Sequence, residues 1–279
     1  MKLTKHTYGK DRVRVMRIHR DGDRHEVREL TVHAMLTGDF SRIFTHADNS
    51  SAISTDTVKN VINVVARENL ALAAEPFCSA VARRFLESYP QVASVSIHAL
   101  ETKWVRLLVG GNPHAHSFLL DSNGKNSVWL EATRQSEAVT SGVAGFTFMK
   151  TTNSGWDKYE KDKYTTILET RDRMCATSLD ASWRWSKAPN DYTNANAKIM
   201  STMLDVFAST YSESVQDSLF RMASAALAAV PEVIDISLAA PNKHYLLINL
   251  DPFKLDNNNQ VFLPTDEPHG QIECTVGRG

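Results

Sequence analysis

Several side chains that can transfer protons or bind ligands stand where strands and helices are expected to begin. Lys10, in the run Tyr8-Gly9-Lys10-Asp11, comes at the start of a predicted strand. Thr55 and Asp56 open a predicted helix, whose free backbone N–H groups suit an anion or a carbonyl oxygen. Taken alone, such a lysine is more often solvated, and such a Thr-Asp pair is more often a helix cap. Two hypotheses therefore stand as alternatives to these structural roles: Lys10 carries protons, and the helix start at Thr55 and Asp56 binds an anion.

A second group pairs an aromatic ring with an arginine. Trp156 and Arg173 flank a segment rich in aromatic and charged residues. A stacked ring together with a bidentate guanidinium suits a flat, oxygen-rich heterocycle. The alternative is that Trp156 and Tyr159 pack into a core. His244, in Asn242-Lys243-His244 between two expected strands, can shuttle protons near neutral pH or be a surface residue.

These residues fall on a duplicated unit. Residues 90–97 (PQVASVSI) match residues 231–238 (PEVIDISL), an offset of 141 residues (231 − 90). At this offset Glu75 falls on Gln216 and Lys103 falls on His244. The polar residue at 75 and 216 is either an ordinary helix-start residue or a ligand anchor, since an amide both donates and accepts hydrogen bonds. Differences between the copies indicate where chemistry was added.

Each copy reads as hairpin, two helices, hairpin. Alternating apolar residues on both sides of Asp21-Gly22 predict the first hairpin. Helical spacing of Val58, Val61, Ile62 and Val65 predicts a helix from Thr55, and a second starts near Glu75-Pro76. Closing strands are expected at residues 92–97 and 102–109. In the second copy a strand opens at Phe146, helices run through residues 200–207 and 219–226, and strands close at 233–238 and 245–250.

The predicted fold class is therefore α+β, with two tandem ββααββ units and antiparallel sheets. The polar, small residues near 135–142 are expected to form a linker. We predict a first unit at residues 1–138 and a second at residues 139–279.

Composition argues against several classes of protein. A hydrophobic content of 42% and a charged content of 23% are typical of an ordinary globular chain. The net charge of −1 argues against nucleic-acid binding, and no apolar run has membrane-spanning length. Three separated cysteines (Cys78, Cys175 and Cys274) indicate a reducing compartment. With no signal peptide and no Ser-Lys-Leu tripeptide at the C-terminus, we expect a cytoplasmic location.

His114-Ala115-His116 allows a different chemistry. On a strand both imidazoles point to one face and can share a metal ion. No Cys, Asp or Glu stands close by in sequence to complete the ligand set, and Asn112-Pro113 resembles a turn. Hydrogen bonding in a strand or turn is the favoured role.

The motifs together closely resemble the urate oxidase (uricase) family over essentially the whole chain. The matching segments, in order, are Tyr8-Gly9-Lys10-Asp11, Ala47-Asp48-Asn49-Ser50, Thr55-Asp56, His114-Ala115-His116-Ser117-Phe118, Thr152-Asn153-Ser154, Tyr164-Thr165-Thr166, Asp172-Arg173, Ser214-Val215-Gln216, Pro241-Asn242-Lys243-His244-Tyr245 and Cys274-Thr275-Val276-Gly277-Arg278. The resemblance implies the tunnelling fold, in which two ββααββ units per chain assemble into an oligomeric β-barrel with helices outside, usually as a homotetramer. It also implies cofactor-independent oxidation of urate by dioxygen and water to 5-hydroxyisourate and hydrogen peroxide, in purine catabolism.

The resemblance assigns roles residue by residue. Arg173 and Gln216 clamp the purine, the Val215 backbone assists, and the N–H groups of Thr55 and Asp56 come from a neighbouring subunit. Lys10, Thr55 and His244 form a proton relay, and Asn242 holds dioxygen or water. Trp156 stands where the family normally has a stacking Phe. Two other hypotheses are a zinc-dependent pterin enzyme of the same fold, with His114 and His116 as ligands, and a purine-binding protein without catalysis.

Overall fold

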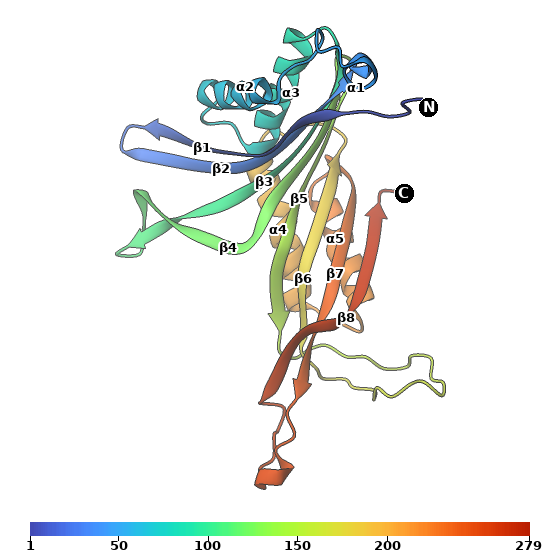
Figure 1. Cartoon of the computed structure of the whole chain (residues 1–279). Helices are drawn as coiled ribbons and strands as arrows, with labels where there is room; N and C mark the ends of the chain where they lie inside the picture. The colour runs from blue at the N-terminus through green and yellow to red at the C-terminus, as the bar shows by residue number, and fades with distance from the viewer. The chain divides into compact units, whose positions relative to one another are not determined.

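The computed structural model describes all residues, 1–279, and the chain divides into two compact units. Unit 1 comprises residues 1–142 with 190–193, and unit 2 comprises residues 143–189 with 194–279. Eight strands follow chain order, β1 to β8, in an antiparallel sheet, and five α-helices complete the α+β fold (Figure 1). The α+β class predicted from the sequence is confirmed. The domain division at residues 138 and 139 stays a prediction.

Unit 1 is a four-stranded sheet with helices on one face. Its elements are β1 (Tyr8–Asp21), β2 (Arg24–Gly38), α1 (Ser41–His46), α2 (Thr55–Glu68), α3 (Ala74–Ser88), β3 (Val92–Val109) and β4 (Asn112–Thr133). Alternate strand residues such as Val32, Ala34 and Ile97 are fully buried, as are Val58 of α2 and Phe77 of α3. The buried face of the strands, formed by every second residue, thus packs against the apolar faces of the helices in one core.

Unit 2 repeats this arrangement. β5 (Glu137–Lys150) runs from unit 1 into unit 2, and β6 (Cys175–Trp185), α4 (Tyr192–Ser209), α5 (Val215–Ala229), β7 (Val233–Leu247), a 3-10 turn (Asp251–Phe253) and β8 (Phe262–Gly277) follow. Trp183, Ile236 and Met222 are among its buried core residues. α5 packs on β7 and β8, as α3 packs on β3 and β4.

The duplication inferred from the sequence extends to the element boundaries. α3 and α5 have the same length, and their first residues, Ala74 and Val215, lie at the offset seen in the sequence. β3 and β7 begin at Val92 and Val233 and show the same order of buried and exposed positions through Trp104 and Tyr245. Equivalent positions in the two units can therefore be compared directly.

The closing hairpins differ from the prediction. Residues 92–109 form one strand rather than two, and its partner is the 22-residue strand β4. The turn falls at Gly110 and Gly111, both with positive φ, and Asn112-Pro113 already belongs to β4. In unit 2, residues 233–247 likewise form a single strand whose partner is β8. The predicted linker is also wrong, because Glu137 to Gly142 form the first part of β5, with Val139 and Ser141 buried.

Candidate functional site

A close approach between two strands positions Lys10 in unit 1. A Cβ on Gly9 would lie 1.9 Å from the Ala34 carbonyl oxygen, so only glycine fits beside Lys10. Lys10 itself pairs with Ala34, and the ladder shifts register between Lys10 and Val13. Arg12, inside this bulge, has a φ of 53°. A bulge of this kind turns neighbouring side chains away from the regular alternation.

The start of α2 carries the second part of this group. The Ser54 side chain caps the helix by accepting a hydrogen bond from the Thr57 N–H at 3.0 Å. The N–H groups of Thr55 and Asp56 precede the first helical hydrogen bond and stay free for a ligand. A hydrogen bond from Lys59 lowers the pKa of the Asp56 carboxyl, and the charge of Lys10 adds to this effect. Lys10 therefore lies near the start of α2. The family resemblance places Lys10 and this helix start in one site.

In unit 2, backbone bridges hold Trp156 and Arg173 together. The Trp156 N–H donates to the Thr170 carbonyl at 2.7 Å, and the Arg173 N–H donates to the Ser154 carbonyl at 2.9 Å. The Arg173 guanidinium carbon lies 5.9 Å from the centre of the Trp156 ring, within cation–π range. Trp156 also stacks on Tyr159, with ring centres 5.5 Å apart. The aromatic and arginine pair predicted from the sequence thus forms one structural group.

A second bridge ties this group to the start of α5. Ser154 and Ser212 form an isolated parallel β-bridge, and the Ser212 N–H donates to the Asn153 carbonyl at 2.9 Å. Ser212 also accepts a 2.7 Å hydrogen bond from Ser218 of α5, so the loop and the helix are fixed to each other. Val215 and Gln216 are the first two residues of this helix, and Ser214 caps it. Gln216 is exposed and its amide makes no hydrogen bond within the chain.

A cavity of about 290 Å³ in unit 2 collects three of the predicted site residues. Arg173, Asn242 and His244 line it, together with Tyr245 and Phe262. Asn242 and His244 lie on β7 on either side of a register shift against β8. This volume is near the lower end of the range for small-molecule sites. Arg173, the His244 imidazole and the Asn242 amide thus line one cavity.

Arg173 is a cation without a carboxylate partner. Burial lowers the pKa of its guanidinium, because removal from water disfavours the charged form. Its Nε atom is buried and has no hydrogen-bond partner. A buried donor left unsatisfied costs free energy.

The predicted site residues therefore fall into two sets. Lys10, Thr55 and Asp56 belong to unit 1. Trp156, Arg173, Val215, Gln216, Asn242 and His244 belong to unit 2. Sequence reasoning did not single out Gly155, where a Cβ would lie 2.3 Å from the Tyr211 hydroxyl oxygen, or the Ser154–Ser212 bridge. The run Asn153-Ser154-Gly155 of small residues was the available signal for close backbone approach.

His114 and His116 lie edge to face with ring centres 4.6 Å apart, and His116 lies 5.7 Å from His25. No group of three or more His, Cys, Asp or Glu in the chain is placed to hold a metal ion. The structure therefore places the three imidazoles in contact with one another through their rings.

Comparisons with known proteins agree with the fold. A family model described as Uricase matches residues 6–130 and 139–273. The uricase of Arthrobacter globiformis is 34% identical over 276 residues, covering 99% of this chain and 90% of that protein. The uricase of Arabidopsis thaliana is 37% identical over 292 residues, covering 97% of this chain and 94% of that protein. The crystal structure of the Arthrobacter globiformis uricase matches with a TM-score of 0.93 at 34% identity, over 100% of this chain and 95% of that one.

The fold is that of an α+β protein, and its second unit contains a cavity lined by an arginine. The chain belongs to the uricase family, and it is accordingly an enzyme, an oxidoreductase with urate oxidase activity. No helix is long and apolar enough to cross a membrane.

Proposed function

We propose that the enzyme oxidises urate with dioxygen and water to 5-hydroxyisourate and hydrogen peroxide, in purine catabolism. Two electrons pass from urate to dioxygen, which is reduced to peroxide, while water supplies the hydroxyl group of the product. The substrate supplies the redox chemistry, so the protein needs to bind it, move protons and exclude competing reactions, with neither a metal nor an organic cofactor. The observation that carries the proposal is the Arg173 guanidinium, which is partly buried, forms no ion pair and lines the same cavity as His244.

Arg173 and Gln216 hold the edge of the purine anion in this proposal. A guanidinium offers paired N–H donors to oxygen atoms, and the amide of Gln216 both donates and accepts. The backbone N–H of Val215, at the first turn of α5, adds a donor with a favourable helix dipole. Trp156 provides the aromatic face on which the flat ring stacks.

Lys10, Thr55 and His244 form the proton relay. Lys10 accepts a proton through the Thr55 hydroxyl, and His244 exchanges protons with the water that attacks the ring. The backbone N–H groups of Thr55 and Asp56 bind the opposite edge of urate. Asn242 holds dioxygen or water above the ring through its amide.

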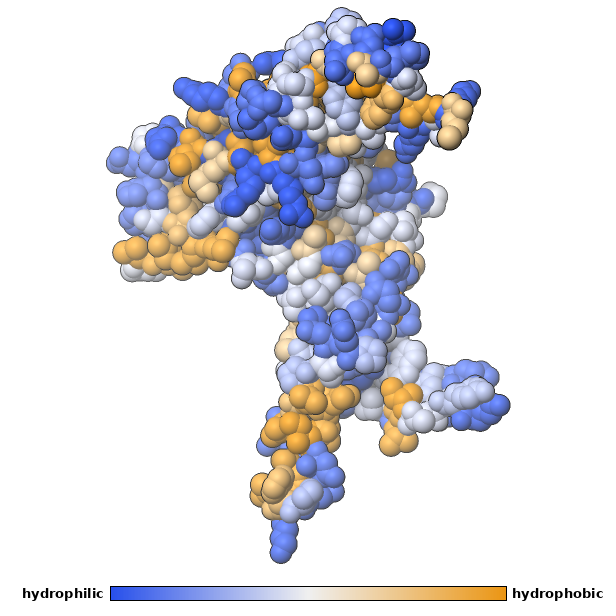
Figure 2. Space-filling view, in the orientation of Figure 1, coloured by the Kyte–Doolittle hydropathy of each residue, from blue (hydrophilic) through white to orange (hydrophobic).

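The relay and the clamp meet across subunits of a homotetramer. Exposed apolar side chains support such an assembly, since Leu108, Val109 and Leu120 near the β3–β4 turn and Leu246 and Leu247 at the end of β7 are each more than half exposed. Figure 2 shows apolar side chains gathered on the far parts of the β3–β4 hairpin and the β7–β8 hairpin. Surfaces of this kind are typical of protein contacts. The free, largely buried cysteines support a reducing, cytoplasmic location.

Loss of urate absorbance in the ultraviolet, with formation of peroxide by metal-stripped protein, tests the reaction. Lys10→Ala and Thr55→Ala should each lose most of the rate while urate binding is largely retained. Full activity of either variant would exclude the relay, and an absence of turnover in the unmodified enzyme would exclude the reaction.

Co-expression of Lys10→Ala and Arg173→Gln chains tests the shared site. If each site combines unit 1 of one subunit with unit 2 of another, a site is intact only where the first chain carries Arg173→Gln and the second carries Lys10→Ala. Random mixing gives this combination at about a quarter of the sites. Sites built within one chain would all carry a defect, so mixed oligomers would be as inactive as either variant alone.

A further inference from the structure

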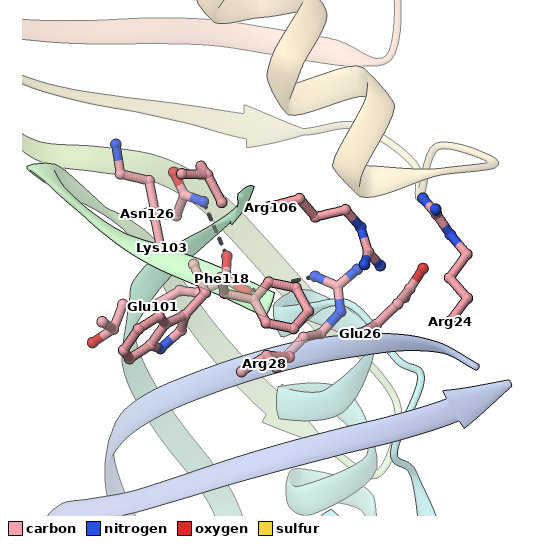
Figure 3. Close-up of a pocket in the computed structure, with 12 residues that line it drawn as sticks. Arg24, Glu26, Arg28, Glu101, Lys103, Arg106, Phe118 and Asn126 are labelled. Carbon is pink, nitrogen blue, oxygen red and sulfur yellow. Dashed lines mark hydrogen bonds and ion pairs between the residues drawn. The ribbon is translucent and has the colours of Figure 1, made fainter. Parts of the chain in front are cut away.

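Unit 1 contains a cavity at the position equivalent to the Arg173 cavity of unit 2. It has a volume of about 370 Å³ and lies between the start of β2 and the middle of β3 (Figure 3). The β3 residues from Glu101 to Arg106 line it. The residues from Asn242 to Leu247, which lie at the repeat offset, line the cavity of unit 2. The same stretch of the duplicated strand therefore forms one wall of each cavity.

The strand ladders confirm this equivalence independently of the sequence match. The β3–β4 ladder shifts register between Glu101 and Lys103, and the β7–β8 ladder shifts between Asn242 and His244. The fourth residue pair after the shift is Arg106 with Phe118 in unit 1 and Leu247 with Phe262 in unit 2. Both phenylalanines line their cavities. Each unit thus has the same bulge and the same aromatic side chain beside its cavity.

The opposite walls are equivalent as well. Leu30 of β2 pairs with Glu101, and Thr177 of β6 pairs with Asn242. Glu26 lies four residues before Leu30, and Arg173 lies four residues before Thr177, just ahead of β6, so Glu26 takes the place of Arg173. Arg24 and Arg28 lie on either side of Glu26 and line the cavity too. In unit 1 a carboxylate therefore stands where unit 2 has the Arg173 guanidinium, with an arginine two residues away on each side; by the same count Arg24 takes the place of Arg171.

The chemistry of the unit 1 cavity favours an anion. Four cationic side chains line it, against the two carboxylates of Glu26 and Glu101; one of the four, Lys103, forms an ion pair with Asp121 at 2.8 Å. Arg28 lies 3.5 Å from Glu101, whereas the Arg24 side chain makes no ion pair or hydrogen bond within the chain. Figure 3 shows the Arg28 and Arg106 side chains extending toward one another, with Arg24 on the far side of Glu26.

Arg106 contributes an uncompensated charge. Its guanidinium donates to the carbonyls of His114 at 3.1 Å and Ala115 at 2.7 Å, and also to that of His25. Carbonyl dipoles orient the group but do not cancel its charge. The guanidinium also lies 5.1 Å from the centre of the Phe118 ring, and Trp104 stands where unit 2 has Tyr245. Cations beside flat aromatic walls suit a planar anion.

We propose that the unit 1 cavity is a second binding site, for a planar oxopurine anion, distinct from the site of oxidation. The choice of oxopurine rests on the proposed function, because the cavity repeats the strand bulge and the aromatic wall of the candidate urate site. Lys103 replaces His244 and Glu101 replaces Asn242, so the site binds the anion and does not oxidise it.

Equilibrium dialysis of urate under nitrogen tests the proposal, because turnover needs dioxygen. The unmodified enzyme should bind two molecules of urate per chain, and Arg173→Gln should leave one, held in unit 1. Adding Arg24→Glu to Arg173→Gln should weaken that remaining site about tenfold, from loss of one charged contact. Arg20→Glu makes the same charge change on the exposed end of β1, outside the cavity, and should leave the affinity unchanged.

One molecule per chain in the unmodified enzyme, lost in Arg173→Gln, would overturn the proposal. Equal weakening by Arg24→Glu and Arg20→Glu would also overturn it, because only general electrostatics would then act. Failure of the proposed function has a separate signature, namely no urate consumption in air by the unmodified enzyme, whatever the binding stoichiometry under nitrogen.

Discussion

Gly155 lies so close to Tyr211 that a Cβ on the glycine would come within 2.3 Å of the tyrosine hydroxyl oxygen. The hydroxyl is held in place, because it donates a 2.7 Å hydrogen bond to the Arg171 carbonyl. The Thr170 carbonyl oxygen would lie 3.1 Å from the same Cβ. Gly155 therefore sets the distance between the Trp156 segment and the start of α5.

We expect Gly155→Ala to raise the KM for urate about tenfold by moving Trp156 away from Arg173 and Gln216, since small misplacements of binding groups are costly. Steady-state kinetics will measure this. Tyr211→Phe removes the hydroxyl that the methyl group would meet, so Gly155→Ala with Tyr211→Phe should recover part of the loss. A double variant no better than Gly155→Ala would show that the hydroxyl contact is not the cause.

The sequence predicted the elements with strong periodicity and missed those with broken alternation. The helix from Thr55 and the helix before Pro90 were predicted correctly because their apolar faces are continuous. β4 was missed because its middle contains Asp121, Asn123 and Gly124, which normally indicate a turn. Long strands tolerate such residues where pairing with β3 continues on either side.

The site residues were predicted by type and family motif, but their surroundings depend on tertiary structure. Nothing local in the sequence shows that Ser154 pairs with Ser212 or that the Arg173 Nε lacks a partner. Both depend on contacts between segments far apart in the chain. The repeat offset, by contrast, was readable from the sequence and predicted that Lys103 and His244 occupy equivalent positions.

Replacement of Arg173 separates charge from geometry. Arg173→Gln should weaken urate binding roughly tenfold to a hundredfold, through loss of a charge-assisted contact. Arg173→Lys keeps the charge but not the planar fork, so it should recover only part of the affinity. Binding under nitrogen measures both variants. Arg171→Lys is the matched control, because that exposed arginine pairs with Asp157 at 2.6 Å and does not line the cavity.

Trp156 can be tested by ring size. Trp156→Phe keeps an aromatic face and should leave the rate of urate oxidation within about twofold of the unmodified enzyme. Trp156→Ala removes the stacking surface and should raise the KM about tenfold. If Trp156 only packs against Tyr159, the two variants will instead differ in thermal stability while the KM stays the same.

Glu29 is a buried carboxylate on β2. Hydrogen bonds from Arg14 at 2.6 Å and from the Trp104 indole at 2.9 Å lower its pKa below the ordinary value of 4.5. A carboxyl with a depressed pKa in the folded state stabilises the fold above its unfolded pKa, and that stabilisation is lost as the pH falls through the folded pKa.

Glu29→Gln preserves the acceptor for Trp104 but removes the charge. Because Arg14 is mostly exposed, the loss at pH 7 should be only about 1 kcal/mol. Urea unfolding should show this difference shrinking as the pH drops below 4.5, whereas Glu160→Gln, at an exposed residue without a partner, should show none at any pH. A difference that persists unchanged in acid would mean that Glu29 acts through packing and not through its charge.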